Sequence, residues 1–411
     1  LTPPSPPSYL FSTNPKIYVY AEALADYREL GWSSYGTLYG TLENYYPQES
    51  DEDSSLAALC TQFFEDAACT QLKAEYQAMS DEDLNEELRV KSEELTDDGQ
   101  LSMFTAMILK IKNNTWAAYE QEFRIHDYQA YSDAKTWNQK LWARCASYMG
   151  NPTGILTRSD GEQLYVFVDE DVPADATLYC AGIGMDQMFN TGKAGQKLKK
   201  GLNIIDGEAN KLYYILYTAD TKTMTKRVSE WPAMKIHIEG GKVDGYFDAS
   251  RHKDADYKKL LNAAANTTFV VKGKHSVMNI RTSVLKQTYP NKIAKAIEAL
   301  DSLSVWEKDL FGISEAVANG EKAGAPYYLT GGDAFYPGYF NNPTYVDNDS
   351  PGSVAHSTEY GIHISLDASK TFLNPYATNY DESGTAHEFG HQLQSPIMLE
   401  GTTEGSNDLF S

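Results

Sequence analysis

The stretch His387-Glu388-Phe389-Gly390-His391 carries the most specific signal in this chain. Residues four apart share one face of a helix, so both imidazoles can reach a single metal ion. Glu388 lies beside them and is placed to polarise a metal-bound water. Zinc fits such a site, because two neutral histidines, one further protein ligand and an open position make a catalytic centre. The simpler interpretation is an amphipathic helix whose histidines only cap or form hydrogen bonds.

The third metal ligand is not given by this stretch alone. The pattern in which Gly and His follow three and six residues after the second histidine is absent, since those positions hold Gln394 and Ile397. Residues 395–403 predict a turn, and Glu404 then falls in the first turn of a following helix, facing back towards the metal. Glu400 lies in the expected loop and is the weaker alternative.

Composition narrows the class of protein. A chain of 411 residues predicts two or three domains, and 42% hydrophobic residues exclude a disordered chain. Subtracting 57 acidic from 35 basic residues gives a net charge of −22, which excludes nucleic acid and an anionic membrane surface as main partners. No run of 18 apolar residues occurs, so no transmembrane segment is expected. Oligomeric state is not predictable from these figures.

The order of patterns along the chain predicts a multidomain α+β protein. Residues 1–15 are a Pro/Ser-rich tether, and 16–149 show helical periodicity with acidic helix starts, which predicts a helical N-terminal domain. Short alternating runs within 150–225, separated by turn residues, predict an antiparallel β-sandwich. The helical domain includes a helix expected at 137–148. Residues 226–411 are mixed, with helices expected at 292–310 and 383–394.

The last domain contains three further patterns. Residues 234–238 and 243–247 predict a hairpin across Glu239-Gly240-Gly241-Lys242. Residues 320–355 predict a long loop, which inside a domain is usually functional. The strand expected at 360–366 is either the sheet edge on which an extended substrate lies or an ordinary buried strand.

The cysteines indicate no metal knuckle. Cys60, Cys69, Cys145 and Cys180 show no CxxC spacing and no neighbouring histidine clusters. A Cys60–Cys69 disulfide and buried free thiols are both compatible with the spacing, and free thiols are favoured.

A family resemblance rests on the HExxH stretch together with 401–411. These residues resemble the enhancin-like metallopeptidases, which are gluzincins in which HExxH is followed, after a variable gap, by a Glu with an Asn three residues later; Glu404 and Asn407 match. Trp231-Pro232 with His237, and Gly245-Tyr246-Phe247, are similar to the start of the family's peptidase domain. The resemblance covers 150–411, and only the HExxH…E core is specific.

The resemblance implies a zincin-like α+β peptidase domain that binds Zn²⁺ through His387, His391 and Glu404. Glu388 is then the catalytic base, and Asn407 is expected to support a zinc-binding histidine. It also implies a bacterial hydrolase, secreted or anchored at the cell surface as a lipoprotein, that acts on mucin-like glycoproteins. The signal segment of such a protein is absent from this sequence.

Aromatic residues near the expected cleft bear on the substrate. Tyr336, Tyr339 and Tyr360 are candidates to stack on sugars, and packing within the loop is the equal alternative. The resemblance implies further helices after Ser411, so we expect a C-terminally truncated peptidase domain and an oxyanion-stabilising residue beyond this chain, which would leave this length inactive. The rival function is a surface protein that binds glycans or proteins through an inactive or incomplete peptidase domain.

Overall fold

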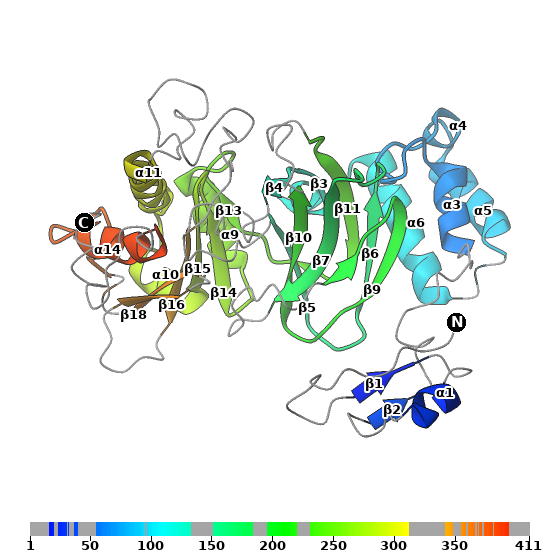
Figure 1. The fold of residues 1–411 in the computed structure, drawn as a ribbon. Helices are drawn as coiled ribbons and strands as arrows, with labels where there is room; N and C mark the ends of the chain where they lie inside the picture. The colour runs from blue at the N-terminus through cyan, green and yellow to red at the C-terminus, as the bar shows by residue number, and fades with distance from the viewer. Residues whose placement is uncertain are drawn as a thin grey trace.

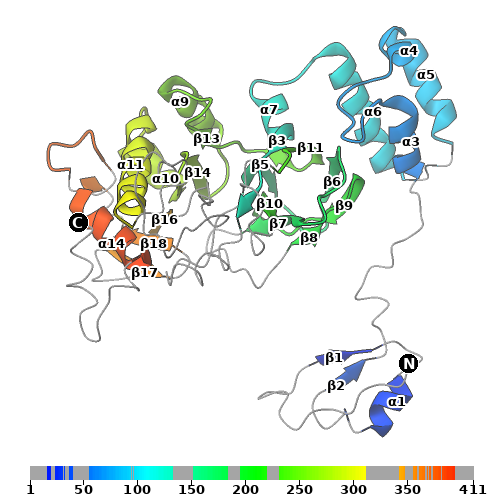
Figure 2. The same ribbon diagram turned by 45° about the horizontal axis from the view of Figure 1, so that its top comes forward.

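The computed structural model describes the greater part of the chain (Figures 1 and 2). The described residues are 16–19, 24–30, 32, 37–39, 55–93, 95, 97–132, 151–183, 195–219, 231–311, 342–347, 355–358, 361–365, 368, 370–371, 374–380 and 382–393. None of the helices in these ranges is long and apolar enough to cross a membrane. The predicted helix at 137–148 lies outside the described residues, as does the predicted tether at 1–15.

The first elements are a small parallel strand pair and a helical layer. Strands β1 (Lys16–Tyr18) and β2 (Thr37–Tyr39) pair in parallel around α1 (Leu24–Glu29). The helical layer consists of α3 (Ser55–Phe63), α4 (Ala74–Gln77), α5 (Asp81–Lys91) and α6 (Asp98–Asn113). Ser80 caps α5 by accepting from the Asp83 N–H at 3.1 Å, as the acidic helix start predicts.

Two β-sheets follow the helical layer. One has the order β12-β5-β10-β7-β8, with β4 beside β10, and the other has the order β3-β11-β6-β9. Their strands are β3 (Ile125–Tyr128), β4 (Tyr131–Ser132), β5 (Asn151–Thr157), β6 (Gln163–Val168), β7 (Ala176–Ile183), β8 (Gln196–Lys197), β9 (Gly201–Asp206), β10 (Lys211–Ala219), β11 (Met234–Gly240) and β12 (Lys242–Val243). Apolar residues of both sheets share one core.

Side chains on the outer face of β6 join this core to the helical layer. Tyr165 and Phe167 are buried among residues of α3 and α6, including Phe63 and Phe104. The helices therefore cover the outer face of the four-stranded sheet, on the right in Figure 1. Whether 16–149 and 150–225 form separate domains stays a prediction.

The predicted hairpin across Gly240-Gly241 is wrong. Strand β11 pairs with β3 and β6, whereas β12 pairs with β5 in the other sheet. Both glycines have positive φ, at 79° and 57°, which lets the chain pass from one sheet to the other. A Cβ atom at Gly240 would collide with the carbonyl oxygen of Gln163, so only glycine fits this crossing.

The C-terminal part of the chain is a mixed sheet with helices. The sheet order is β13-β14-β15-β16-β18-β17, with both parallel and antiparallel pairs. Its strands are β13 (Phe247–Asp248), β14 (Thr268–Lys272), β15 (Ser276–Arg281), β16 (Asn342–Asp347), β17 (Ala355–Thr358) and β18 (Gly361–Ser365). The helices are α9 (Asp254–Ala263), α10 (Thr282–Thr288), α11 (Ala294–Phe311) and α14 (Glu382–Leu393).

Two expectations for this sheet need correction. The predicted loop at 320–355 contains β16, because 342–347 finds parallel partners on both sides in β15 and β18. The predicted edge strand, β18, lies between β16 and β17 and is therefore an interior strand, which is the alternative interpretation. Among the described strands, β17 is the outermost at this end of the sheet.

A short helix, α7 (Glu120–Arg124), contacts strands of both β-sheets, β3 and β11 in one and β5 and β12 in the other. Phe123 is 1% exposed and belongs to the same core as Tyr246, Phe247 and Tyr257 of the C-terminal part. The next residue, Arg124, donates a hydrogen bond from Nη1 to the carbonyl oxygen of Ile238 on β11. This helix therefore connects the C-terminal core to the sheets before it.

Candidate metal centre

Helix α14 carries the HExxH stretch, and one face of it is part of the C-terminal core. Thr385 and Phe389 are fully buried and Ala386 is 3% exposed. The helix packs against α11, β17 and β18. Because these core positions lie on one side, the helix is held with its remaining face directed away from the sheet.

The two histidines lie together on that remaining face. His387 and His391 are both half-buried, and their ring centroids are 4.8 Å apart with an angle of 87° between the ring planes. The i, i+4 spacing brings them together, as the sequence predicts. Two imidazoles this close, neither fully covered, can bind one ion together.

Glu388 lies between them in the sequence and is 7% exposed. A buried glutamate beside two histidines is a side chain that can serve in proton transfer. In the described part of the chain, no group of three or more His, Cys, Asp or Glu residues could hold a metal ion. The donors present, two imidazoles with a neighbouring carboxylate, suit zinc and need one more protein ligand.

The other predicted site residues fall outside the described ranges. These are Glu404 and Asn407, and the aromatic candidates Tyr336, Tyr339 and Tyr360. Of the predicted site, the structure therefore brings together His387, Glu388 and His391.

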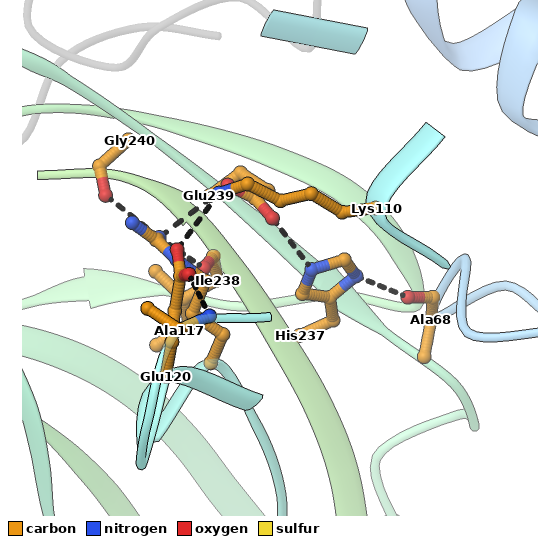
Figure 3. Close-up of polar contacts among 9 residues, drawn as sticks. Ala68, Lys110, Ala117, Glu120, His237, Ile238, Glu239 and Gly240 are labelled. Carbon is orange, nitrogen blue, oxygen red and sulfur yellow. Dashed lines mark hydrogen bonds and ion pairs between the residues drawn. The ribbon is translucent and has the colours of Figure 1, made fainter. Parts of the chain in front are cut away.

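A second polar cluster, which we call the charged cluster, is buried between the helical layer and β11 (Figure 3). The family resemblance suggested that His237 lies at the start of the peptidase domain, and its side chain is fully buried in this cluster. Its Nδ1 lies 3.2 Å from the Ala68 carbonyl oxygen and its Nε2 lies 3.1 Å from Oε1 of Glu239. Strand alternation could have indicated the pair, because residues two apart share one face.

The cluster continues through α7 to α6. Glu239 lies 3.4 Å from Nη1 of Arg124, which also donates to the carbonyl oxygens of Ile238 and Gly240. Nε of Arg124 donates to Glu120 at 3.0 Å, and Nζ of Lys110 donates to the same carboxylate at 2.8 Å. Positive and negative side chains thus alternate from Lys110 to Glu239.

Glu239 is the carboxylate that joins His237 to Arg124. Burial raises the pKa of Glu239, but the hydrogen bond with His237 and the charge of Arg124 bring that pKa below its ordinary value, so Glu239 is ionised. The two ring nitrogens of His237 thus face a carbonyl oxygen on one side and an ionised carboxylate on the other.

A second histidine, half-buried on β3, lies beside positive charge. His126, on β3, has Nδ1 3.4 Å from Nη1 of Arg251. Burial and the charges of Arg251 and Lys272 lower the pKa of His126 to about 4. This histidine is therefore neutral near neutral pH and accepts from the guanidinium.

Comparison with known proteins shows that the fold of this chain resembles the folds of solved metallopeptidases. No family model and no curated sequence matches the chain. A metallopeptidase from Bacteroides thetaiotaomicron matches over 88% of this chain and 56% of its own, at 24% identity and a TM-score of 0.66. A metallopeptidase in complex with Tn antigen matches over 71% and 51%, at 27% identity and a TM-score of 0.57.

A third structure, holding the M60 catalytic domain of Clostridium perfringens ZmpB, matches over 86% of this chain and 36% of its own, at 15% identity and a TM-score of 0.57. The structural neighbours are enhancin-like metallopeptidases. The resemblance stated from the HExxH stretch is thereby confirmed in the fold. The chain spans about half the length of the first two structures it matches.

Proposed function

We propose that this chain is the zinc-binding part of a peptidase that cleaves extracellular, mucin-like glycoproteins. The observation that carries the proposal is the pair of half-buried histidine rings 4.8 Å apart on α14, with the buried Glu388 beside them. The fold shared with metallopeptidases supports the same class of reaction.

In this proposal His387, His391 and Glu404 hold the metal. Zinc bound there would lower the pKa of a bound water and polarise the scissile carbonyl. Glu388 takes a proton from the attacking water and returns it to the leaving amine. The core face of α14, through Ala386 and Phe389, fixes the position of the helix that carries the two histidines and Glu388.

The substrate part of the proposal comes from a neighbour. A metallopeptidase of the same fold, 27% identical over the matched region, is bound to Tn antigen, a glycan antigen. We infer that the substrate carries a short glycan near the scissile bond. A protein with such a substrate works outside the cell, so we propose that this one is secreted or attached to the surface.

The test uses the full-length protein and compares an O-glycosylated peptide bearing Tn antigen with the same peptide lacking the sugar. We expect zinc-dependent cleavage of the glycosylated peptide, and a loss of about 10²–10⁴-fold in rate for Glu388→Gln, because general acid–base catalysis contributes that much. Glu298→Gln, which changes an exposed glutamate on the neighbouring helix α11, is the matched control and should keep the rate. Cleavage that survives Glu388→Gln contradicts the mechanism.

The same assay distinguishes the proposed peptidase from a protein that only binds glycans. A protein that only binds glycans would retain the glycosylated peptide without bound zinc and without cleaving it. Zinc content measured on the same preparation therefore decides between catalysis and binding.

A further inference from the structure

The N-terminal end of α11 is held by side chains from two other parts of the chain. The N–H groups of Ile293 and Ala294 donate to Oδ1 of Asp254, the first residue of α9, at 2.8 and 3.0 Å. The next N–H group, that of Lys295, donates to the hydroxyl oxygen of Tyr376 at 3.1 Å. N–H groups in the first turn of a helix have no partner within the helix, so these two side chains supply the missing acceptors.

Tyr376 lies in a turn on the approach to the helix that carries the HExxH stretch. Its own N–H group donates to Oδ1 of Asn374 at 3.2 Å, and the N–H group of Ala377 donates to the Asn374 carbonyl oxygen at 2.9 Å. Helix α14 begins at Glu382, a few residues further along the chain. The hydroxyl group of Tyr376 therefore connects the segment before α14 to the first turn of α11.

The aromatic ring of Tyr376 makes a second contact with the same end of α11. Nζ of Lys292 lies 5.8 Å from the ring centroid, and Nζ of Lys295 lies 5.9 Å from it. Ammonium groups at this distance over an aromatic face are attracted to the ring. Phenylalanine at this position would keep the ring between the two lysines and would lose only the hydroxyl acceptor, so the two contacts can be tested separately.

Helix α11 also packs along α14 itself. Phe389 of α14 belongs to the same buried core as Ile297 and Leu300 of α11. Helix α11 thus holds α14 by its core face, while Tyr376 attaches the segment before α14 to the start of α11. These two attachments fix both the position of α14 and the direction from which the chain enters it. The histidine pair, His387 and His391, lies in the helix that is held in this way.

We propose that Tyr376 is a positioning residue for the metal centre: its hydroxyl group, bound to the Lys295 N–H group, fixes the start of α14 and thereby the placement of His387 and His391. Tyr376 acts through the backbone and binds neither metal nor substrate. Side chains bind one ion tightly only when the surrounding structure holds them in the required geometry, so a looser entry into α14 lowers the affinity for zinc. This inference rests on the zinc centre proposed above and adds to it a support from the start of α11.

The test is the zinc affinity of the full-length protein, measured by competition with a chelator. Tyr376→Phe should weaken zinc binding by about twofold to tenfold, because the loss of one hydrogen bond shifts an equilibrium by about that factor. Tyr376→Ala, which also removes the ring from between the two lysines, should weaken zinc binding further. Wild-type zinc affinity in both variants overturns the proposal.

A matched control separates positioning from a general loss of stability. Tyr257 donates its hydroxyl group to the Tyr289 carbonyl oxygen at 2.8 Å in the same core, away from the approach to α14. Tyr257→Phe should lower the melting temperature of the zinc-free protein and leave the zinc affinity unchanged. Equal losses of zinc affinity in Tyr257→Phe and Tyr376→Phe would mean that any weakening of this core has the same effect, which also overturns the proposal.

Amide hydrogen exchange of the zinc-free protein distinguishes this inference from the proposed function. Tyr376→Phe should speed exchange in α14 relative to the wild type and to Tyr257→Phe, because a helix that is less firmly attached opens more often. If the wild type binds no zinc, the proposed function fails, and exchange alone decides the role of Tyr376. Faster exchange in α14 then supports its attachment through Tyr376, and unchanged exchange overturns it.

Discussion

Nε2 of His237 lies 3.1 Å from Oε1 of Glu239, two residues along the same strand, with both side chains buried. Each ring nitrogen of His237 faces an acceptor, and Glu239 also lies 3.4 Å from Nη1 of Arg124. Glu239 therefore contacts both a buried histidine and a buried arginine, and it links β11 to α7.

Replacing Glu239 with Ala should strongly destabilise the fold. The change removes the carboxylate that faces His237 and one of the two carboxylates beside Arg124, and breaking a buried ion pair by removing one partner costs about 3–5 kcal/mol. Urea unfolding measures the loss. Glu86→Ala is the control, because Glu86 is 62% exposed in its ion pair with Arg89, and such surface pairs contribute about 0–1 kcal/mol. Equal losses for the two variants would mean that the charged cluster contributes no more than a surface pair.

His126 should make stability depend on pH in a defined window. Its pKa in the folded chain is about 4, below the ordinary value of 6.5, because of burial and the charges of Arg251 and Lys272. Between these values the unfolded chain binds the proton and the folded chain does not, so the free energy of unfolding falls as pH is lowered from 6.5 towards 4.

Comparison of the wild type with His126→Gln tests this dependence. Gln keeps an acceptor for Arg251 but has no proton to bind, so the slope of stability against pH should be shallower in the variant. Unfolding in urea at a series of pH values gives both slopes. Parallel slopes across the window would show that His126 keeps its ordinary affinity for the proton.

Gly240→Ala should cost more than Gly161→Ala, although φ is nearly the same at the two positions, 79° and 78°. Each variant forces a side chain into the left-handed region, at about 1–2 kcal/mol. At Gly240 the new methyl group also meets the carbonyl oxygen of Gln163, whereas nothing lies within 4 Å at Gly161. Melting temperatures should therefore fall further for Gly240→Ala, and equal falls would mean that the strand crossing can widen at no cost.

The crossing at Gly240 also shows what the sequence could predict. Local patterns found the strands: the alternation at 163–168 coincides with β6, and 234–238 lies within β11. The partners were not predictable, because alternation reports a half-buried strand and not the strand beside it. A Gly-Gly turn between two strands resembles a hairpin, but here each strand pairs with a segment more than 60 residues earlier in the chain, β6 for β11 and β5 for β12.

The same reasoning explains the outcome at the metal centre. His387 and His391 are four residues apart on one helix, so their proximity follows from local geometry and was predicted. The position of β18 within the sheet was not predictable in this way, because the alternation at 361–365 is equally compatible with an edge and an interior strand. β18 is an interior strand because β17 pairs with it, and β17 is only four residues long and has no strong pattern of its own.

Zinc should stabilise the chain through His391. A ligand that binds only the folded state raises its stability by about 2.7 kcal/mol at 100 times its dissociation constant, so added zinc should raise the melting temperature and a chelator should reverse the effect. His391→Ala removes one of two imidazoles whose centroids are 4.8 Å apart and should abolish the zinc-dependent rise. His126→Gln, at a half-buried histidine on β3, is the matched control and should keep that rise. A zinc effect that is unchanged in His391→Ala would place the metal at other residues and would contradict the proposed centre.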